Sequence, residues 1–241
     1  MKILIHGAAG SMGQVLCQMV EPDELVAVET VKPKEGMIAT LSDAPVCDVV
    51  VDFSNPSLLA GVIDYCQRNR VGLVLGTTNL EEIHQKQLQA LALHVPVIVS
   101  SNFSYGVSVM RQLVAAATKA LEEFDIELSE THHIHKLDAP SGTAKTLLRD
   151  IKKASSQPRQ EVYGRGPGSP AKEPGEIGVH SIRSGENPGE HTVVFSSKEE
   201  QIEITHKAFG KQVFAKGALQ AAKWLVTQQP GYYTMKEFTN E

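Results

Sequence analysis

Three histidines and a lysine crowd the stretch from His132 to Lys136, and a Pro-Ser-Gly-Thr turn follows at residues 140–143. Histidine changes its charge near neutral pH, and lysine carries a positive charge that can bind an anion or donate a proton. Three kinds of site fit these residue types: a metal site, an anion-binding turn and an acid–base centre. The neighbouring sequence has to discriminate among them.

A metal site has the least support. No cysteine lies near His132, and no His-x-x-x-His pair or third ligand has the spacing of a structural zinc site. A nucleophilic hydrolase is not indicated either, because the G-x-S-x-G elbow is absent. We therefore expect no metal, and we expect a histidine of this cluster and Lys136 to act as proton donors or as electrostatic groups.

The spacing of His132 and Lys136 predicts a bend. In a fully extended strand the two side chains would share a face but stand roughly 13 Å apart, at ~3.3 Å per residue. The chain must therefore turn after the histidines if both are to serve one small substrate. The turn at Ser141, Gly142 and Thr143 then offers backbone N–H groups and hydroxyls at a helix start, which suits a carboxylate. Together these groups would suit a small dianion.

The elements that must position these residues divide the chain into two parts. In the first hundred residues, apolar stretches alternate with helical patterns; the apolar stretches are 2–7, 24–29, 48–53, 71–78 and 95–101. Strands that are apolar throughout and separated by helices indicate a parallel sheet covered on both faces. We predict an α/β fold that begins with a Rossmann-like, doubly wound parallel sheet.

A glycine-rich turn follows the first of these strands. Gly10 and Gly13 fit the last two positions of the G-x-G-x-x-G dinucleotide fingerprint, and Ala8 stands where its first glycine would be. Gly7, one residue earlier, supplies a glycine for the turn. Small residues let the backbone approach a pyrophosphate, and the N–H groups of the following helix point at it. This pattern predicts a dinucleotide site.

An acidic residue supports the same prediction. Glu29 ends the second predicted strand, 19 residues after Gly10, where an acid usually binds a ribose hydroxyl. Lys32 and Lys34 follow it, and they are either solvated loop lysines or contacts for a 2′-phosphate. Both NADH and NADPH therefore remain open.

The second part of the chain has a different pattern. Helices are expected at 103–124 and 143–154, and alternating strands at 125–135, 177–185, 190–197 and 200–208. This pattern indicates an α+β domain with a mixed sheet. The stretch 157–178 is dense in glycine, proline and charge, and we expect a long loop or lid there. The last helix begins near residue 213, is expected to end at Pro230 and returns to the first domain. We expect a dinucleotide-binding domain of residues 1–103 and 214–241, and a substrate-binding and oligomerisation domain of residues 104–213.

Composition excludes some partners. The chain has 241 residues, a formal net charge of -5 and 41% hydrophobic residues. Its lysines and arginines are scattered, so we expect no nucleic-acid partner. No apolar run approaches the roughly 20 residues of a membrane span, and we expect no membrane partner. Three cysteines without a Cys-x-x-Cys pattern favour free thiols in a reducing cytoplasm.

The segment from Glu130 to Ala144, ETHHIHKLDAPSGTA, resembles the signature of the 4-hydroxy-tetrahydrodipicolinate (dihydrodipicolinate) reductase family. Further similar stretches are the glycine-rich turn at 7–13, DFSNP at 52–56, GTT at 76–78, NFSYGV at 102–107, GEHTVVF at 189–195, EITHKA at 203–208 and FAKGA at 214–218. The resemblance implies NADH- or NADPH-dependent reduction of 4-hydroxy-tetrahydrodipicolinate in lysine and diaminopimelate synthesis. It also implies two domains with a hinge, and a homotetramer built through the second sheet.

The resemblance assigns roles by position. His132 would be the proton donor or acceptor and Lys136 a proton donor. Substrate binding would fall to His133, Ser141, Gly142 and Thr143. Cofactor binding would fall to Gly7, Ala8, Ala9, Gly10, Ser11, Met12, Glu29, Gly76, Thr77, Thr78, Ser100, Ser101, Asn102 and Phe103. We expect His135 to be structural or exposed, and we expect the apolar Ile134 and Leu137 to anchor the segment between the histidines and the turn.

Two alternatives stay open at this stage. A redox sensor that binds NAD(P) without turnover would keep the fingerprint and would not need His132 or Lys136. Another two-domain dehydrogenase would share the architecture. An acylating aldehyde dehydrogenase is disfavoured, because it would need a cysteine in the second domain and all three cysteines lie within the first 66 residues.

Overall fold

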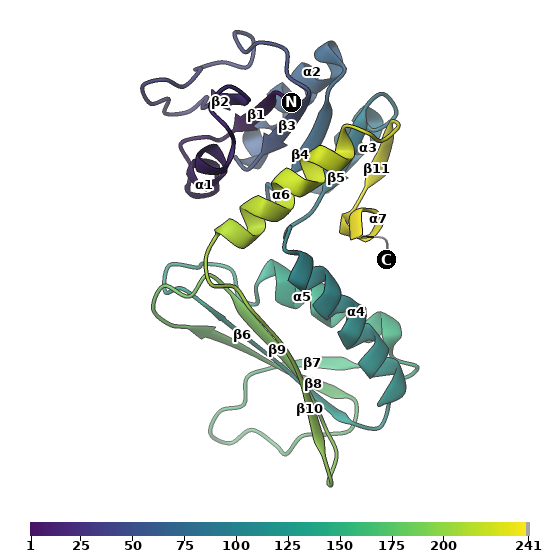
Figure 1. The fold of residues 1–241 in the computed structure, drawn as a ribbon. Coiled ribbons are helices and arrows are strands. Elements are labelled where there is room, and N and C mark those ends of the chain that lie inside the picture. Colours follow the sequence, from purple (N-terminus) through teal and green to yellow (C-terminus); the bar gives the residue numbers. More distant parts are fainter. Residues whose placement is uncertain (240–241) are drawn as a thin grey trace. The chain divides into compact units, whose positions relative to one another are not determined.

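A computed structural model describes residues 1–239 of the chain (Figure 1). The chain forms two compact units. The first contains Met1–Ser104 and the chain from Lys211 onward, and the second contains Tyr105–Gly210. The chain therefore leaves the first unit once and returns to it after the second.

A six-stranded parallel sheet forms the centre of the first unit. Its strands are β1 (Ile3–His6), β2 (Leu25–Val28), β3 (Val49–Asp52), β4 (Gly72–Leu75), β5 (Pro96–Val99) and β11 (Gly231–Tyr233). Their order across the sheet is β11-β5-β4-β3-β1-β2, and all the pairings are parallel. The helical elements are α1 (Ser11–Met19), η1 (Pro56–Leu58), α2 (Leu59–Asn69), α3 (Glu82–Leu91), α6 (Gln212–Leu225) and α7 (Met235–Thr239). The predicted doubly wound sheet is confirmed.

Helices cover both faces of this sheet because its strands are apolar on both sides. In β1, Ile5 belongs to a core cluster that includes residues of α1 and α6, whereas Leu4 belongs to a second cluster with α2 and α3. Strands β1, β3 and β4 are buried at all positions. The sheet edge at the carboxyl ends of the strands is therefore the part left for a ligand.

A mixed five-stranded sheet forms the second unit. Its strands are β6 (Asp125–His132), β7 (Gln160–Tyr163), β8 (Glu176–Arg183), β9 (Glu190–Ser196) and β10 (Gln201–Lys207), in the order β10-β9-β6-β8-β7. Strand β9 runs antiparallel to β6 and β10, while β6 and β7 run parallel to β8. This arrangement confirms the predicted α+β class.

Two helices cover one face of this sheet, α4 (Tyr105–Ala120) and α5 (Gly142–Ala154) (Figure 1). Strand β6 alternates strictly, so that Ile126 and Leu128 are buried in the cluster that includes residues of both helices. Glu130 and His132 continue the same alternation on the same face. The alternation thus places two titratable side chains on the core-facing side of β6, at the end of the strand.

Three local predictions were wrong. Strand β6 ends at His132, three residues before its predicted end. Strand β7 lies inside the stretch expected to be a loop; it is only four residues long and has no buried position, so it has no alternating pattern to detect. Helix α6 ends at Leu225, and β11 and α7 follow Pro230. Lys172, in the remainder of the predicted loop, forms an ion pair with Glu127 of β6 at 2.5 Å.

Candidate active site

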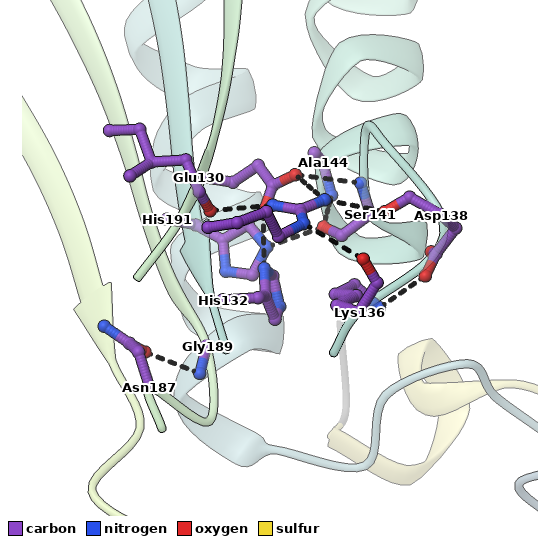
Figure 2. A network of polar contacts seen from close by, with 11 residues as sticks. Glu130, His132, Lys136, Asp138, Ser141, Ala144, Asn187, Gly189 and His191 are labelled. Carbon is purple, nitrogen blue, oxygen red and sulfur yellow. Dashed lines mark hydrogen bonds and ion pairs between the residues drawn. The ribbon is translucent and has the colours of Figure 1, made fainter. Parts of the chain in front are cut away.

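The site in the second unit begins with a buried histidine–carboxylate pair at the end of β6. The carboxylate of Glu130 is 1% exposed, and its Oε2 accepts a hydrogen bond from Nδ1 of His132 (Figure 2). The two residues are two positions apart on one strand, so their side chains point to the same face. The carboxylate fixes the imidazole ring and directs Nε2 away from itself.

Arg183 completes this pair from the neighbouring strand. It lies opposite His132 in the β6–β8 register, and its Nη2 and Nη1 atoms donate to Oε1 and Oε2 of Glu130 at 3.0 and 3.1 Å. Burial raises the pKa of Glu130, but the hydrogen bonds from His132 and Arg183 outweigh burial and lower it to about 2. The carboxylate is therefore ionised at neutral pH and keeps the proton of His132 on Nδ1.

The chain turns directly after the strand, as the spacing of His132 and Lys136 predicted. The N–H of Lys136 donates to the carbonyl of His133 at 3.1 Å, which closes a turn. Nζ of Lys136 then contacts Oδ1 of Asp138 at 2.7 Å (Figure 2). Burial raises the pKa of Asp138, and the hydrogen bond from Lys136 more than offsets it, so the net shift is downward. Lys136 is thus held by an ionised carboxylate.

The predicted apolar anchors of this turn are wrong. Ile134 is 58% exposed and Leu137 is 98% exposed. Polar contacts hold the turn instead, because Arg183 donates to the carbonyls of Lys136 and Asp138 at 3.4 and 2.7 Å. One arginine therefore positions both the carboxylate behind His132 and the backbone that carries Lys136.

Ser141 begins helix α5 and is almost fully buried. Its Oγ accepts from the N–H of Ala144 at 3.2 Å, and its own N–H donates to Oε1 of Glu130 at 3.3 Å (Figure 2). Its Oγ is also 3.0 Å from Nε2 of His191. These contacts place the first turn of α5, with Gly142 and Thr143, beside the Glu130 pair.

His191 lies on β9 against the same pair. It is 3% exposed, and its ring meets the ring of His132 edge to face at 5.2 Å between centroids. Burial lowers the pKa of His191 to about 3, and the neighbouring His132 adds to the shift. The ring is therefore neutral at neutral pH. Its Nδ1 is buried without a hydrogen-bond partner in the part of the chain that the structure describes.

A glycine borders the outer nitrogen of His132. A Cβ at Gly189 would stand 3.1 Å from Nε2 of His132, and the φ of Gly189 is +145°. The N–H of this glycine donates to Oδ1 of Asn187 at 2.8 Å (Figure 2). A side chain at position 189 would press on the nitrogen that faces away from Glu130, so glycine preserves the space at that atom.

The glycine-rich turn in the first unit has the close packing that a dinucleotide site needs. Gly7 has a φ of +78°, and a Cβ there would stand 2.8 Å from the carbonyl oxygen of Phe53. A Cβ at Gly13 would stand 2.0 Å from the carbonyl oxygen of Gly7, so only glycine lets α1 start this close to β1. Gly10 precedes α1 without a side chain to cap it, which leaves the first amides of the helix for a ligand.

Glu29 lies under this turn. Its Oε2 accepts from the N–H of Ala9 at 3.2 Å and its Oε1 accepts from the N–H of Val31 at 3.0 Å. Thr77 follows β4, and the turn from Ser100 to Phe103 follows β5. Because the strands are parallel, all these segments lie at the same edge of the sheet. The residues present fit a nicotinamide dinucleotide.

The predicted residues therefore fall into two groups. The structure brings His132, Lys136 and the start of α5 together in the second unit, and it brings the glycine-rich turn, Glu29 and Thr77 to one edge in the first. His133 is partly exposed beside them. His135 is exposed, with its ring nitrogen 4.0 Å from Glu186.

Four residues that build this site carry no role in the sequence prediction: Glu130, Arg183, Gly189 and His191. The sequence could have predicted the role of Glu130, because an acid two residues before a histidine on an alternating strand lies on the same face as the histidine. The partnership with Arg183 depends on the strand register, which no local pattern reveals.

Within residues 1–239, no group of three or more histidine, cysteine, aspartate or glutamate side chains is placed to hold a metal ion. Every helix in this range is too short or too polar to span a lipid bilayer.

Family models match both halves of the chain. The model described as dihydrodipicolinate reductase, N-terminus, matches residues 1–103, and the one described as dihydrodipicolinate reductase, C-terminus, matches residues 106–238. The 4-hydroxy-tetrahydrodipicolinate reductase of Methanoregula boonei is 40% identical over 98% of this chain and 96% of its own. The enzyme of the same name from Staphylococcus aureus strain MSSA476 is 41% identical over 97% of this chain and 98% of its own.

A solved structure has the same fold. The dipicolinate-bound dihydrodipicolinate reductase from Paenisporosarcina sp. TG-14 superposes with a TM-score of 0.74 over 98% of both chains, at 23% identity. Together with the matches in sequence, this likeness confirms the resemblance that the motifs predicted. The chain belongs to the dihydrodipicolinate reductase family.

Proposed function

We propose that His132 is the proton-transferring residue in the reduction of 4-hydroxy-tetrahydrodipicolinate, a reaction of lysine and diaminopimelate synthesis. Family membership confirms the prediction of a nicotinamide-dependent oxidoreductase with this activity. The observation that carries the assignment of His132 is its geometry: an ionised carboxylate fixes Nδ1, and a glycine leaves space at Nε2. This is the arrangement in which an imidazole can exchange a proton with a bound molecule.

Lys136 supplies positive charge in the same place. A substrate with two carboxylates gains from a cation, and a protonated amine also stabilises negative charge that develops during reduction. The contact with Asp138 at 2.7 Å orients the amine before substrate binds. We assign Lys136 the role of second proton donor, next to His132.

The start of α5 binds a substrate carboxylate in this proposal. Gly142 and Thr143 form the first turn, where backbone N–H groups point outward and favour an anion. His133, beside the turn, adds a polar contact. Ser141 contributes mainly by holding the turn, because its Oγ and N–H already bond within the chain.

The cofactor residues follow the predicted set. The turn from Gly7 to Met12 would hold the pyrophosphate, Glu29 the ribose, and the segments Gly76–Thr78 and Ser100–Phe103 the nicotinamide side. A bound reduced nicotinamide supplies the hydride. The carboxylate of Glu29 is fixed by two backbone N–H groups, so its orientation towards a ribose is set in advance.

The protein is proposed to act as a homotetramer in the cytoplasm. Strand β6 alternates between core residues and the partly buried Glu127, Ser129 and Thr131, which belong to the face opposite the helices. The half-exposed Ile182 of β8 adds apolar surface there. We propose that this face pairs with other copies of the chain. A sedimentation experiment that finds only monomers at micromolar concentration would contradict it.

Turnover is the test of the proposed activity. The absorbance of the reduced nicotinamide is followed with NADH and with NADPH, while the preceding enzyme of the pathway generates the substrate in situ. We expect oxidation of at least one cofactor. Binding of a cofactor without any oxidation would instead support the redox-sensor alternative.

A further inference from the structure

The first unit contains a second buried histidine–carboxylate pair, which the proposed reaction does not use. Nδ1 of His6 lies 2.6 Å from Oδ1 of Asp52, and both residues are 0% exposed. His6 is the last residue of β1 and Asp52 is the last residue of β3, and the two strands are neighbours in register. The pair therefore joins two strand ends at the carboxyl edge of the sheet.

Asp52 also accepts hydrogen bonds from the loops that follow β3 and β4. Its Oδ1 accepts from the hydroxyl of Ser54 at 2.6 Å, and its Oδ2 accepts from the hydroxyl of Thr77 at 2.7 Å. Thr77 Oγ1 in turn accepts from the N–H of Ser54 at 3.0 Å. The carboxylate thus receives three donors from three different strand ends.

The network extends to the fourth strand end on the other side. Nε2 of His6 is 3.4 Å from Oγ1 of Thr30, which directly follows Glu29. In sheet order β4-β3-β1-β2, the network runs through Thr77, Asp52, His6 and Thr30 without skipping a strand. Gly7 follows His6 directly, so the same network fixes the start of the glycine-rich turn.

We propose that His6 and Asp52 are positioning residues for the dinucleotide. They hold the loops after four adjacent strands at the spacing that the cofactor requires. The proposal rests on the placement of the cofactor at this edge under the proposed function. A buried hydrogen-bonded pair is seldom needed to stabilise a core, since apolar groups of the same shape in place of both partners can be nearly neutral or even stabilising. Its position beneath the loops, rather than in the middle of the sheet, indicates alignment of those loops.

Substitutions at position 6 separate alignment from simple packing. His6→Leu keeps the volume but removes the donor to Asp52, whereas His6→Asn keeps a donor near the place of Nδ1. Equilibrium titration of each purified protein with NADH, followed by nicotinamide fluorescence, gives Kd. We expect His6→Leu to raise Kd roughly tenfold, as the loss of a charge-assisted hydrogen bond does, and His6→Asn to restore most of the affinity. Titration with the dicarboxylate dipicolinate should give the same Kd in all three proteins.

A matched control accounts for lost stability. Tyr65 is 1% exposed and donates to the carbonyl of Pro45 at 2.7 Å, near the amino end of β3 and away from the loops. Tyr65→Phe should lower the melting temperature while leaving the Kd for NADH within twofold. If His6→Leu is too unstable to purify, Ser54→Ala removes another donor to Asp52 and should raise Kd two- to fivefold.

A substitution at the helix start tests the placement itself. Ser11→Glu puts a negative charge at the exposed N-terminus of α1, where the pyrophosphate is proposed to bind, and should abolish NADH binding. If Ser11→Glu weakens binding and folded His6→Leu stays within twofold of the parent, the positioning role is wrong and the placement stands. If neither variant weakens binding, the cofactor placement is wrong and the positioning role is wrong with it.

Discussion

The two buried histidine–carboxylate pairs of this protein have similar chemistry and different surroundings. In the second unit, Glu130 and His132 lie on one strand, and the outer nitrogen of the imidazole borders Gly189. In the first unit, His6 and Asp52 lie on neighbouring strands, and the outer nitrogen faces Thr30 at 3.4 Å. A histidine beside a carboxylate is therefore not in itself evidence of proton transfer.

The other partners of each carboxylate explain the difference. Glu130 is neutralised by the paired N–H groups of Arg183 and also accepts from the N–H of Ser141, so the carboxylate is a rigid support for the ring of His132 and for the start of α5. Asp52 instead accepts hydrogen bonds from the hydroxyls of Ser54 and Thr77, which belong to separate loops. The first arrangement orients one ring beside a helix start, and the second joins the loops that follow separate strands.

Replacement of His132 should have the largest effect on kcat and is the strongest test of the difference between the two pairs. His132→Asn can still donate to Glu130 but cannot exchange a proton, so we expect kcat to fall roughly 10²- to 10⁴-fold. The Kd for NADH should not change. Steady-state kinetics and fluorescence titration measure the two quantities. His6→Asn is the matched variant in the other pair, and a comparable loss of kcat there would contradict the distinction.

Replacement of the carboxylates should give the next largest effect. In Glu130→Gln the amide can no longer act as a charged acceptor for Nδ1 and leaves Arg183 without its counter-ion, so we expect kcat to fall on the order of 100-fold. Asp52→Asn should raise the Kd for NADH more than it lowers kcat. The same kinetic and binding measurements apply to both. If Glu130→Gln and Asp52→Asn change kcat and the Kd for NADH in the same proportion, the two pairs do not have different roles.

His191, which packs against the Glu130–His132 pair, should make the free energy of unfolding depend on pH. Its folded pKa of about 3 lies below the ordinary value of 6.5, so the unfolded chain binds a proton in this range that the folded chain does not. Above pH 6.5, this group does not lower the free energy of unfolding. The free energy of unfolding then falls as the pH decreases from 6.5 towards 3. Glu130, His132, His206 and Lys136 act on the same ring. From pH 7.5 to pH 5, the free energy of unfolding should fall by about 2 kcal/mol more in the parent than in His191→Gln.

Denaturant unfolding at the two pH values measures this difference. The window lies above the range in which Glu130 titrates, because its folded pKa is about 2 and its ordinary value is 4.5. His135→Gln is the matched control, since the side chain of His135 is 72% exposed. It should keep the pH dependence of the parent. An equal pH dependence in His191→Gln would mean that burial of His191 has no such cost.

Much of the fold was predictable because its signals are local. The central strands of the first unit are apolar on both faces, and β6 in the second alternates with a period of two. Strand β7 was missed because a short edge strand without buried residues has no pattern. The spacing of His132 and Lys136 also predicted the bend, since only a turned chain lets both side chains serve one small substrate.

The interior of the site was less predictable because its contacts join distant residues. Arg183 is 53 residues from Glu130, and it meets the carboxylate only because β8 pairs with β6 in one particular register. The apolar character of Leu137 suggested an anchor, but the same arginine holds the turn through backbone carbonyls. A hydrophobic residue in a polar loop therefore did not identify what fixes the loop.

The smallest predicted effect tests this last point. Leu137→Ser should change the free energy of unfolding by less than about 0.5 kcal/mol, because an almost fully exposed side chain buries no surface to lose. Arg183→Gln should be far more destabilising, since it leaves Glu130 as a buried charge without its partner. Denaturant unfolding of both variants gives the comparison. A loss in Leu137→Ser as large as that in Arg183→Gln would show that Leu137 packs against another surface in solution and would restore its role as an anchor.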